Sequence, residues 1–300
     1  MAATIASPAD ALAFVARFDT FLLDCDGVIW LGNTLVPGVA DTLAWLRSLG
    51  KRILFVTNNS TKSRADYLRK FTTLGLQASV DEIFGSSYAA AYYIAHQLDF
   101  PKDKRVYVCG MSGICDELAS EGIAYCGAHE DTDHITDMAH LGDIKTDPSI
   151  GAVLFGFDIN INYTKLARAF TYVHANPGCH FLATNSDLTF PAGGTVYPGT
   201  GALLAALSAP LGREPTVLGK PHQPMLDVIV NKYHLDRSRT CMIGDRLDTD
   251  IEFGKRGGLS TLLVMTGVTT QKELASSAIV PDFAIDSLGS LGTKYGPGSQ

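Results

Sequence analysis

The stretch from Phe21 to Trp30 constrains the fold more than any other part of the chain. Three apolar residues, Phe21 to Leu23, lead into Asp24, and a second acid, Asp26, follows after one residue. An apolar run that ends in Asp and Gly predicts a buried strand opening into a loop. In open α/β sheets, ligands bind at the carboxyl ends of such strands. Two carboxylates crowded there repel each other, so at neutral pH a cation, a shared proton or both must compensate them.

The composition restricts the class of protein. The 300 residues suit one large domain or two smaller ones, and 46% hydrophobic with 18% charged residues supply enough apolar material for a core. The net charge of −7 argues against broad binding to nucleic acids or anionic membranes, which need a basic face. The six cysteines have no CxxC spacing, which argues against a zinc site. No secretion signal or membrane-spanning apolar run is evident, so we expect a cytoplasmic enzyme with reduced thiols.

Helix-like and strand-like segments alternate through most of the chain. This alternation, with short polar loops, predicts a Rossmann-like α/β core with a parallel, doubly wound sheet. The alternation of helix-like and strand-like segments is interrupted near residue 86 and resumes near residue 196. We therefore predict a catalytic core over 1–85 and 196–300 and an inserted α/β cap domain over 86–195. The core elements that we expect lie at 37–50, 53–56, 63–74, 201–208, 217–218, 225–233, 240–243, 251–256 and 261–265.

Polar residues follow three further strand-like segments. Thr57 and Asn58 come before a helix and offer groups that suit an anion, although the same pair is also an ordinary helix cap. Lys220 stands between Gly and Pro and is a candidate site residue, and the simple alternative is that it is an ordinary surface lysine. Asp245 and Asp250 follow a second buried strand, in the same way as Asp24 and Asp26 follow the first. Taken together, these residues predict a site for a hard metal ion and a phosphate.

These residues, in this order, resemble the four motifs of the haloacid dehalogenase-like hydrolases: Asp24-x-Asp26-Gly27, Thr57, Lys220, and Gly244-Asp245 with Asp250. The large insertion between the second and third motifs is similar to the type IIA cap of that superfamily. The longer strings, such as Asp24-Cys25-Asp26-Gly27-Val28-Ile29-Trp30, resemble one branch. That branch holds eukaryotic phosphoglycolate phosphatases, fungal 4-nitrophenylphosphatases and the pyridoxal-phosphate phosphatase chronophin. The likeness extends from about residue 18 to 288.

The resemblance implies a role for each matching residue. Asp24 would be the nucleophile that forms an aspartyl-phosphate, and Asp26 the general acid and base. Mg²⁺ would be held by Asp24, the main-chain carbonyl of Asp26, and Asp245. Lys220 would neutralise charge between Asp24 and the phosphate, with Asp250 behind it to orient Lys220 or a metal-bound water. Substrate-binding roles would fall to Gly27, Thr57, the Asn58 N–H group, Asn185 and Phe190.

The preferred substrate is expected to be a small phosphorylated acid such as 2-phosphoglycolate. Asn185 and Phe190 stand in a cap loop, 183–191, that resembles the chronophin loop through Thr-Asn-x-Asp, but chronophin has a histidine where this chain has Phe190. A phenyl ring cannot donate a hydrogen bond to a pyridine substituent, which disfavours pyridoxal phosphate.

Other functions stay open at this point. Within the branch, a pyridoxal-phosphate or phosphoprotein phosphatase is the alternative, and a catalytically idle partner-binding protein is the alternative from a different class. The branch also suggests a homodimer formed through the cap. Trp30 and Trp45 are expected to anchor the core or the loop that follows the first strand.

Overall fold

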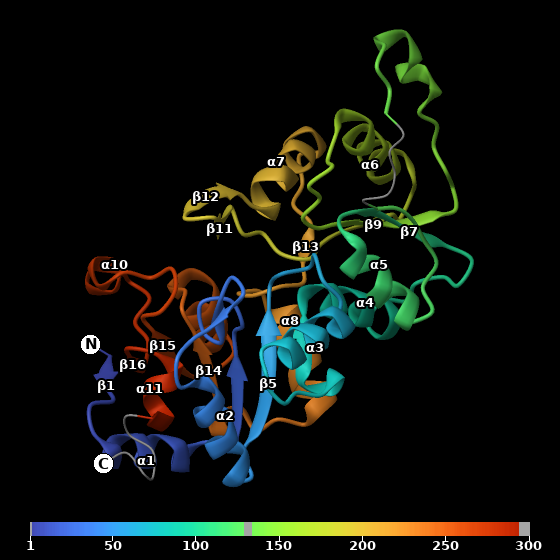
Figure 1. The fold of residues 1–300 in the computed structure, drawn as a ribbon. Helices are drawn as coiled ribbons and strands as arrows, with labels where there is room; N and C mark the ends of the chain where they lie inside the picture. The colour runs from blue at the N-terminus through green and yellow to red at the C-terminus, as the bar shows by residue number, and fades with distance from the viewer. Residues whose placement is uncertain (1, 129–133, 294–300) are drawn as a thin grey trace. The chain divides into compact units, whose positions relative to one another are not determined.

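The computed structural model describes residues 2–128 and 134–293, and these form two compact units. Among the described residues, the first unit comprises 2–57, 68–84 and 220–293. The second unit comprises 58–67, 85–128 and 134–219. Each unit has its own parallel sheet flanked by helices (Figure 1). The predicted α/β class is therefore confirmed.

The sheet of the first unit has seven strands. Its order is β1 (Ala3–Thr4), β16 (Phe283–Ile285), β15 (Ser260–Val264), β14 (Thr240–Gly244), β2 (Thr20–Leu23), β5 (Arg52–Thr57) and β6 (Ile83–Gly85). The pairs from β1 through to β5 are all parallel. Strand β2 is buried at every position, as its apolar sequence predicts for a central strand.

Among the described residues of the first unit, four helices lie close to their predicted bounds, namely α2 (Val39–Ser48), the part of α3 (Arg64–Thr73) from Leu68 onward, α8 (Gln223–Tyr233) and α9 (Glu252–Arg256). The sequence pattern did not predict the other three, namely α1 (Pro8–Arg17), α10 (Gln271–Ser276) and α11 (Leu288–Thr293). A short hairpin, β3 (Trp30–Leu31) and β4 (Thr34–Leu35), follows β2.

The second unit contains a five-stranded parallel sheet and a separate hairpin. The sheet order is β13 (Thr216–Val217), β10 (His180–Ala183), β9 (Ile150–Phe155), β7 (Arg105–Cys109) and β8 (Tyr125–Gly127), and the hairpin consists of β11 (Thr189–Ala192) and β12 (Thr195–Pro198). The helices are α4 (Ser86–His96), α5 (Ser112–Ser120), α6 (Tyr163–Ala175) and α7 (Thr200–Leu211). Two buried clusters form its core, and they include Leu154 and Phe181.

Residues 58–67, 85 and 196–219 belong to the second unit, whereas the sequence pattern placed them in the catalytic core. Strand β13 pairs with β10, and α7 buries Leu204 and Leu207 in the same cluster as Phe181. The local pattern predicted the α7 helix and the β13 strand correctly. It did not indicate which sheet they join, because that choice depends on contacts between distant segments.

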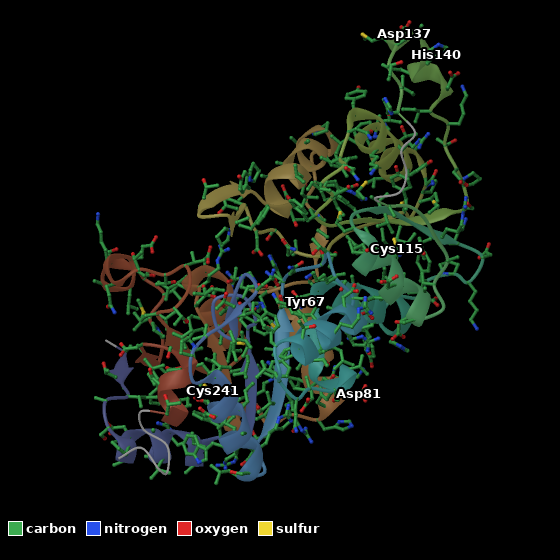
Figure 2. All side chains as sticks on the ribbon, in the orientation of Figure 1. Tyr67, Asp81, Cys115, Asp137, His140 and Cys241 are labelled. Atoms are coloured by element: carbon green, nitrogen blue, oxygen red, sulfur yellow. The ribbon has the colours of Figure 1, made fainter. Side chains whose placement is uncertain are left out.

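The structure describes all six cysteines, and none of them forms a disulfide. Cys241 lies on β14 and Cys115 on α5 (Figure 2). Burial, with the nearby Asp24 and Asp26 carboxylates, raises the pKa of the Cys25 thiol well above its usual value, which makes this thiol unreactive. In the described ranges, no helix is long and apolar enough to cross a membrane.

Candidate active site

The topology of the first sheet brings the predicted catalytic residues to one edge. The chain passes from β2 to β5 on one side and later returns to β14 on the other, so β2 and β14 flank a switch point of the strand order. Leu23 is level with Ile243 and with Phe55, which places the ends of the three strands side by side. Asp24 and Asp245 therefore leave adjacent strands at the same edge.

Lys220 is the centre of the polar contacts at this edge. Its ammonium group carries three N–H donors, and Nζ lies 2.8 Å from Asp24 Oδ1, 2.7 Å from Asp250 Oδ1 and 2.8 Å from the Val56 carbonyl oxygen. The Lys220 side chain is only 2% exposed. Lys220 is thus fixed between two carboxylates and is not a surface lysine.

The cluster has more negative than positive groups. Carboxylate oxygens of Asp24, Asp245 and Asp250 lie within 4.8 Å of one another, and Lys220 is the lysine that pairs with two of these acids. Burial and the neighbouring acids raise the pKa of Asp24, although Lys220 opposes the shift. Burial and then Asp250 raise the pKa of Asp245 to about 7. Burial alone would lower the pKa of Lys220, but Asp24 and Asp250 raise it. Two acids therefore hold protons more tightly than usual, and a bound cation would displace them.

The two carboxylate oxygens of Asp245 differ in their hydrogen bonding. Its Oδ2 accepts a hydrogen bond of 2.6 Å from the Val268 N–H, whereas its Oδ1 is buried without a hydrogen-bond partner among the described residues. A Cβ at Gly27 would lie 2.6 Å from the Asp245 carboxyl carbon, and Gly27 has a φ of +87°. Glycine is thus needed there both for the turn and for the close approach. The arrangement of an orphaned carboxylate oxygen among acids fits a hard divalent cation.

Asp250 occupies a short π-helical turn, Leu247–Ile251. Its Oδ1 accepts from Lys220, and its Oδ2 accepts from the backbone N–H groups of Asp245 and Arg246 at 3.1 and 3.0 Å. A Cβ at Gly244 would lie 2.1 Å from the Asp250 Cβ, so only glycine lets the two segments approach this closely. These donors engage both carboxylate oxygens of Asp250. Asp250 is therefore placed to hold Lys220 in position rather than to be a direct metal ligand.

Asp26 differs from the buried acids of this cluster, because its side chain is 50% exposed. Its Oδ1 accepts a hydrogen bond of 2.8 Å from Trp30 Nε1 and lies 3.9 Å from Lys70 Nζ. Neither Trp30 nor Lys70 was predicted as a contact of Asp26. The spacing of four residues between Asp26 and Trp30 offered a weak signal, but nothing in the sequence places Lys70 there.

Thr57 ends β5 and is buried, as a group at the switch-point edge should be. Asn58, Asn185 and Phe190 are assigned to the second unit. The Asn185 amide donates to the Asn58 carbonyl at 2.8 Å, and its Oδ1 accepts from the Asp187 N–H at 3.1 Å. These bonds engage both the nitrogen and the oxygen of the Asn185 side-chain amide. The role of Asn185 in substrate binding stays a prediction. The Phe190 ring, on β11, packs edge-on against Phe157 at 5.1 Å.

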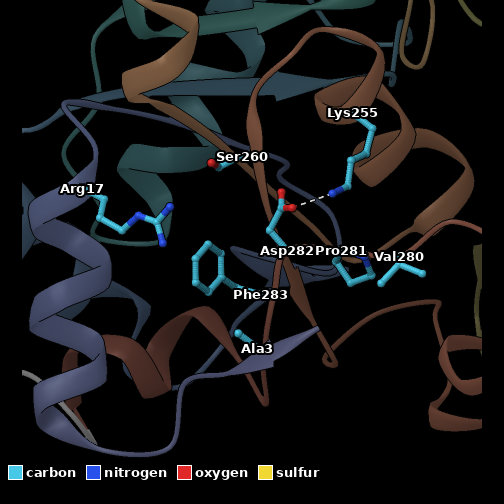
Figure 3. A pocket seen from close by; sticks show the side chains of 8 residues that line it. All are labelled: Ala3, Arg17, Lys255, Ser260, Val280, Pro281, Asp282 and Phe283. Atoms are coloured by element: carbon cyan, nitrogen blue, oxygen red, sulfur yellow. Dashed lines mark hydrogen bonds and ion pairs between the residues drawn. The ribbon is translucent and has the colours of Figure 1, made fainter. Parts of the chain in front are cut away.

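A cavity of 460 Å³ lies elsewhere in the first unit (Figure 3). Its lining includes Ser260 and Phe283, which are the first residues of β15 and β16. It therefore opens at the amino ends of the strands, away from the edge that carries Asp24 and Asp245. Arg17 and the Lys255–Asp282 ion pair complete much of its wall. This cavity is not part of the candidate active site.

Two family models match the chain. One, for haloacid dehalogenase-like hydrolases, covers residues 21–124, and the other, for HAD-hydrolase-like proteins, covers residues 217–291. The matched ranges include every first-unit residue of the predicted site.

Curated relatives and a solved structure extend these matches over nearly the whole chain. The 4-nitrophenylphosphatase of Schizosaccharomyces pombe is 44% identical over 97% of this chain and 99% of its own length. Phosphoglycolate phosphatase 2 of Arabidopsis thaliana is 45% identical over 94% of this chain and 95% of its own. The structure of a glycerol phosphate phosphatase from Mycobacterium tuberculosis in complex with magnesium matches with a TM-score of 0.77 and 29% identity, covering 92% of this chain and 77% of that one.

Proposed function

The chain belongs to the phosphatases among the haloacid dehalogenase-like hydrolases, and we propose that it is a Mg²⁺-dependent phosphomonoesterase for small phosphorylated acids, with 2-phosphoglycolate as its preferred substrate. The observation that carries this proposal is the buried Asp24 carboxylate, held 2.8 Å from Lys220 at the end of β2 beside the under-bonded Asp245. A fixed nucleophile next to a fixed positive group is what phosphoryl transfer requires.

Mg²⁺ would be held by Asp24, the Asp26 carbonyl and Asp245. The close approach of the carboxylate oxygens and the orphaned Asp245 Oδ1 support this choice, because hard cations prefer oxygen ligands. A solved relative that carries magnesium supports it further. When bound, the ion would neutralise charge on the phosphate and on the nucleophile.

The residues of the chain divide the remaining work. Asp24 attacks phosphorus and gives an aspartyl-phosphate while the leaving oxygen takes the electron pair of the broken P–O bond. Asp26 donates a proton to that oxygen and later accepts one from the water that hydrolyses the intermediate. Lys220 stays charged beside the transferred group, because its carboxylate partners raise its pKa, and so it stabilises the negative charge of the transition state. Asp250 keeps Lys220 in place, and Thr57 and the Asn58 N–H group are the proposed ligands of the phosphoryl oxygens.

The proposed substrate rests on the relatives and on the cap loop. A phosphoglycolate phosphatase is 45% identical to this chain over almost its full length. Phe190, which is apolar where chronophin has histidine, disfavours pyridoxal phosphate. 4-Nitrophenyl phosphate is the expected artificial substrate, since a relative at 44% identity is named for it.

We also propose a homodimer formed through the second unit and a cytoplasmic location. Leu188, Val196 and Tyr197 on and beside the β11–β12 hairpin are large apolar side chains that face solvent, which supports a contact with a second copy. The absence of disulfides among six cysteines supports a reducing compartment. Sedimentation of wild type and Val196→Asp tests the dimer, and a fluorescent fusion tests the location.

One screen tests the function. Phosphate release is measured over 2-phosphoglycolate, glycerol 3-phosphate, pyridoxal phosphate, a phosphopeptide and 4-nitrophenyl phosphate, with Mg²⁺ and with EDTA. We expect Mg²⁺-dependent release that is fastest for 2-phosphoglycolate among the metabolites. Faster phosphate release from another tested metabolite would make that compound the preferred substrate. No release from any tested compound would overturn the proposed enzymatic function in favour of a partner-binding protein.

A further inference from the structure

Trp30 turns back onto the carboxylate that the mechanism uses as its general acid and base. The chain from Asp24 to Trp30 folds around the Cys25 carbonyl, which accepts from the Ile29 and Trp30 N–H groups at 2.8 and 3.2 Å. The Gly27 N–H donates to the Trp30 carbonyl at 2.8 Å. This tight loop brings the indole Nε1–H to 2.8 Å from Asp26 Oδ1. The contact is thus built into the loop that carries both catalytic acids.

The indole itself is held firmly. Trp30 is fully buried, and its ring packs edge-on against Phe71 at 5.0 Å. Lys70, the neighbour of Phe71 on α3, places its Nζ 4.0 Å from the centre of the Trp30 ring and 3.9 Å from Asp26 Oδ1. Its side chain is only 15% exposed. One turn of α3 therefore supplies both the packing and a positive charge beside the same carboxylate oxygen.

We propose that Trp30 is a positioning residue for the acid–base step at Asp26 and that Lys70 supports it; this inference rests on the proposed phosphatase function. Half of the Asp26 side chain is exposed, so an untethered carboxylate would sample several orientations in water. The indole N–H and the ammonium both engage Oδ1, which leaves Oδ2 for the transferred proton. Holding the donor in one orientation lowers the entropic cost of the step.

The chemistry makes the proposal testable through the leaving group. When the P–O bond breaks, an alkoxide leaving group needs the Asp26 proton as it takes the electron pair. 4-Nitrophenolate is stable enough to leave largely without it. A residue that acts through Asp26 must therefore matter for alkyl phosphates and matter little for 4-nitrophenyl phosphate. A residue that only packs the core would affect both substrates alike.

The first experiment compares Trp30→Phe with Trp45→Phe, the same substitution at the other tryptophan of the chain, on α2. We expect Trp30→Phe to lower kcat for 2-phosphoglycolate or glycerol 3-phosphate by about 10- to 100-fold, a part of the ~100- to 10,000-fold worth of general acid–base catalysis. For 4-nitrophenyl phosphate the loss should stay below about threefold on the same scale. Trp45→Phe should change neither rate. Equal losses on both substrates would overturn the proposal.

Two further variants separate the hydrogen bond from packing. Benzothienylalanine at position 30 keeps the shape of the indole but replaces its N–H by sulfur, so it should reproduce the selective loss even if Trp30→Phe folds poorly. Lys70→Met should show a weaker selective loss that Lys70→Arg restores. If the sulfur isostere retains wild-type rates on alkyl phosphates, the indole N–H has no positioning role.

A double-mutant cycle decides whether Trp30 acts through Asp26. In an Asp26→Asn background, Trp30→Phe should cause no further selective loss on alkyl phosphates, because the group that it positions is gone. Losses that multiply would show independent action and overturn the proposal. A wild-type protein that hydrolyses neither kind of substrate would overturn the phosphatase function and this inference together. An active wild type with unselective variants overturns this inference alone.

Discussion

Two buried lysines, one in each unit, have very different surroundings. Lys220 in the first unit contacts Asp24 and Asp250 at 2.8 and 2.7 Å, with the Asp245 carboxylate close by. Lys165 in the second unit contacts the fully buried Asp158 at 2.8 Å and is itself 1% exposed. The backbone N–H of Asn160 also donates a hydrogen bond of 2.8 Å to Asp158 Oδ1.

The difference lies in the balance of charge. The Lys165–Asp158 pair has one positive and one negative group, so it can be buried without a further ligand. The Lys220 cluster has three acids around one ammonium group, and it pushes the pKa of Asp245 to about 7. A surplus of buried carboxylates creates a need for a cation, whereas a balanced pair creates none. The surplus of carboxylates, rather than burial or the presence of an ion pair, distinguishes the candidate active site from the balanced Lys165–Asp158 pair.

The largest expected effect is at Asp24. Asp24→Asn should abolish turnover while the fold stays intact, because the amide cannot attack phosphorus and is nearly the same size. Residual Mg²⁺-dependent hydrolysis above roughly one part in a thousand of wild type, the scale of losing one key catalytic group, would exclude Asp24 as the nucleophile. Circular dichroism and thermal unfolding serve as the control for folding.

The balanced pair should matter for stability instead. Lys165→Met leaves Asp158 buried without its partner and should lower the free energy of unfolding by about 3 kcal/mol. Urea unfolding measures the loss. The double variant Lys165→Met with Asp158→Leu removes both charges and should recover most of it. A single variant as stable as wild type would mean that the pair is not buried as described, and would remove the contrast with Lys220.

The pH dependence of stability tests the surplus of carboxylates. Burial raises the pKa of Asp245 in the folded protein to about 7, from 3.8 for an ordinary aspartate. The folded metal-free protein therefore binds more protons than the unfolded chain between these values. It should lose stability as the pH rises from about 4 to 7, by at most about 1.4 kcal/mol per pH unit for this group. Acidification toward pH 4 restores that stability.

Mg²⁺ should reverse this loss, because it binds the deprotonated carboxylate. The rise in Tm on adding Mg²⁺ should be larger at pH 8 than at pH 5.5, as measured by scanning calorimetry. Asp245→Asn is the matched control and should flatten the slope and remove the response to Mg²⁺. A shift in Tm that is equal at both pH values would contradict a proton-occupied metal site.

The smallest expected effect concerns substrate choice in the second unit. We predict that 2-phosphoglycolate exceeds pyridoxal phosphate in kcat/KM by at least about tenfold, which equals roughly 1.4 kcal/mol of transition-state binding. Phe190→His should narrow this ratio, and changes at Asn185 should also alter it, while 4-nitrophenyl phosphate turnover moves far less. Phe190→Leu keeps an apolar side chain and serves as the control. An unchanged ratio would show that this loop does not set specificity.

The sequence alone determined the fold class and the residues at the strand ends. An apolar run followed by Asp or Thr is a local pattern, and the order of Asp24, Thr57, Lys220 and Asp245 along the chain sufficed to indicate the family. Parallel strands necessarily bring their carboxyl ends to one edge, so the meeting of these residues followed from the fold class.

The tertiary structure decided which groups face one another. Lys220 contacts the Val56 carbonyl, and Lys70 lies beside Asp26, although the residues of each pair are distant in sequence. The burial of the Asp245 oxygen that has no hydrogen-bond partner among the described residues also depends on such packing. The same holds for residues 196–219, whose helix and strand were foreseen but whose sheet was not. Secondary structure follows mainly from the periodicity of nearby residues. Strand partners, burial and shifted pKa values depend on packing between distant segments, and a local pattern does not contain that information.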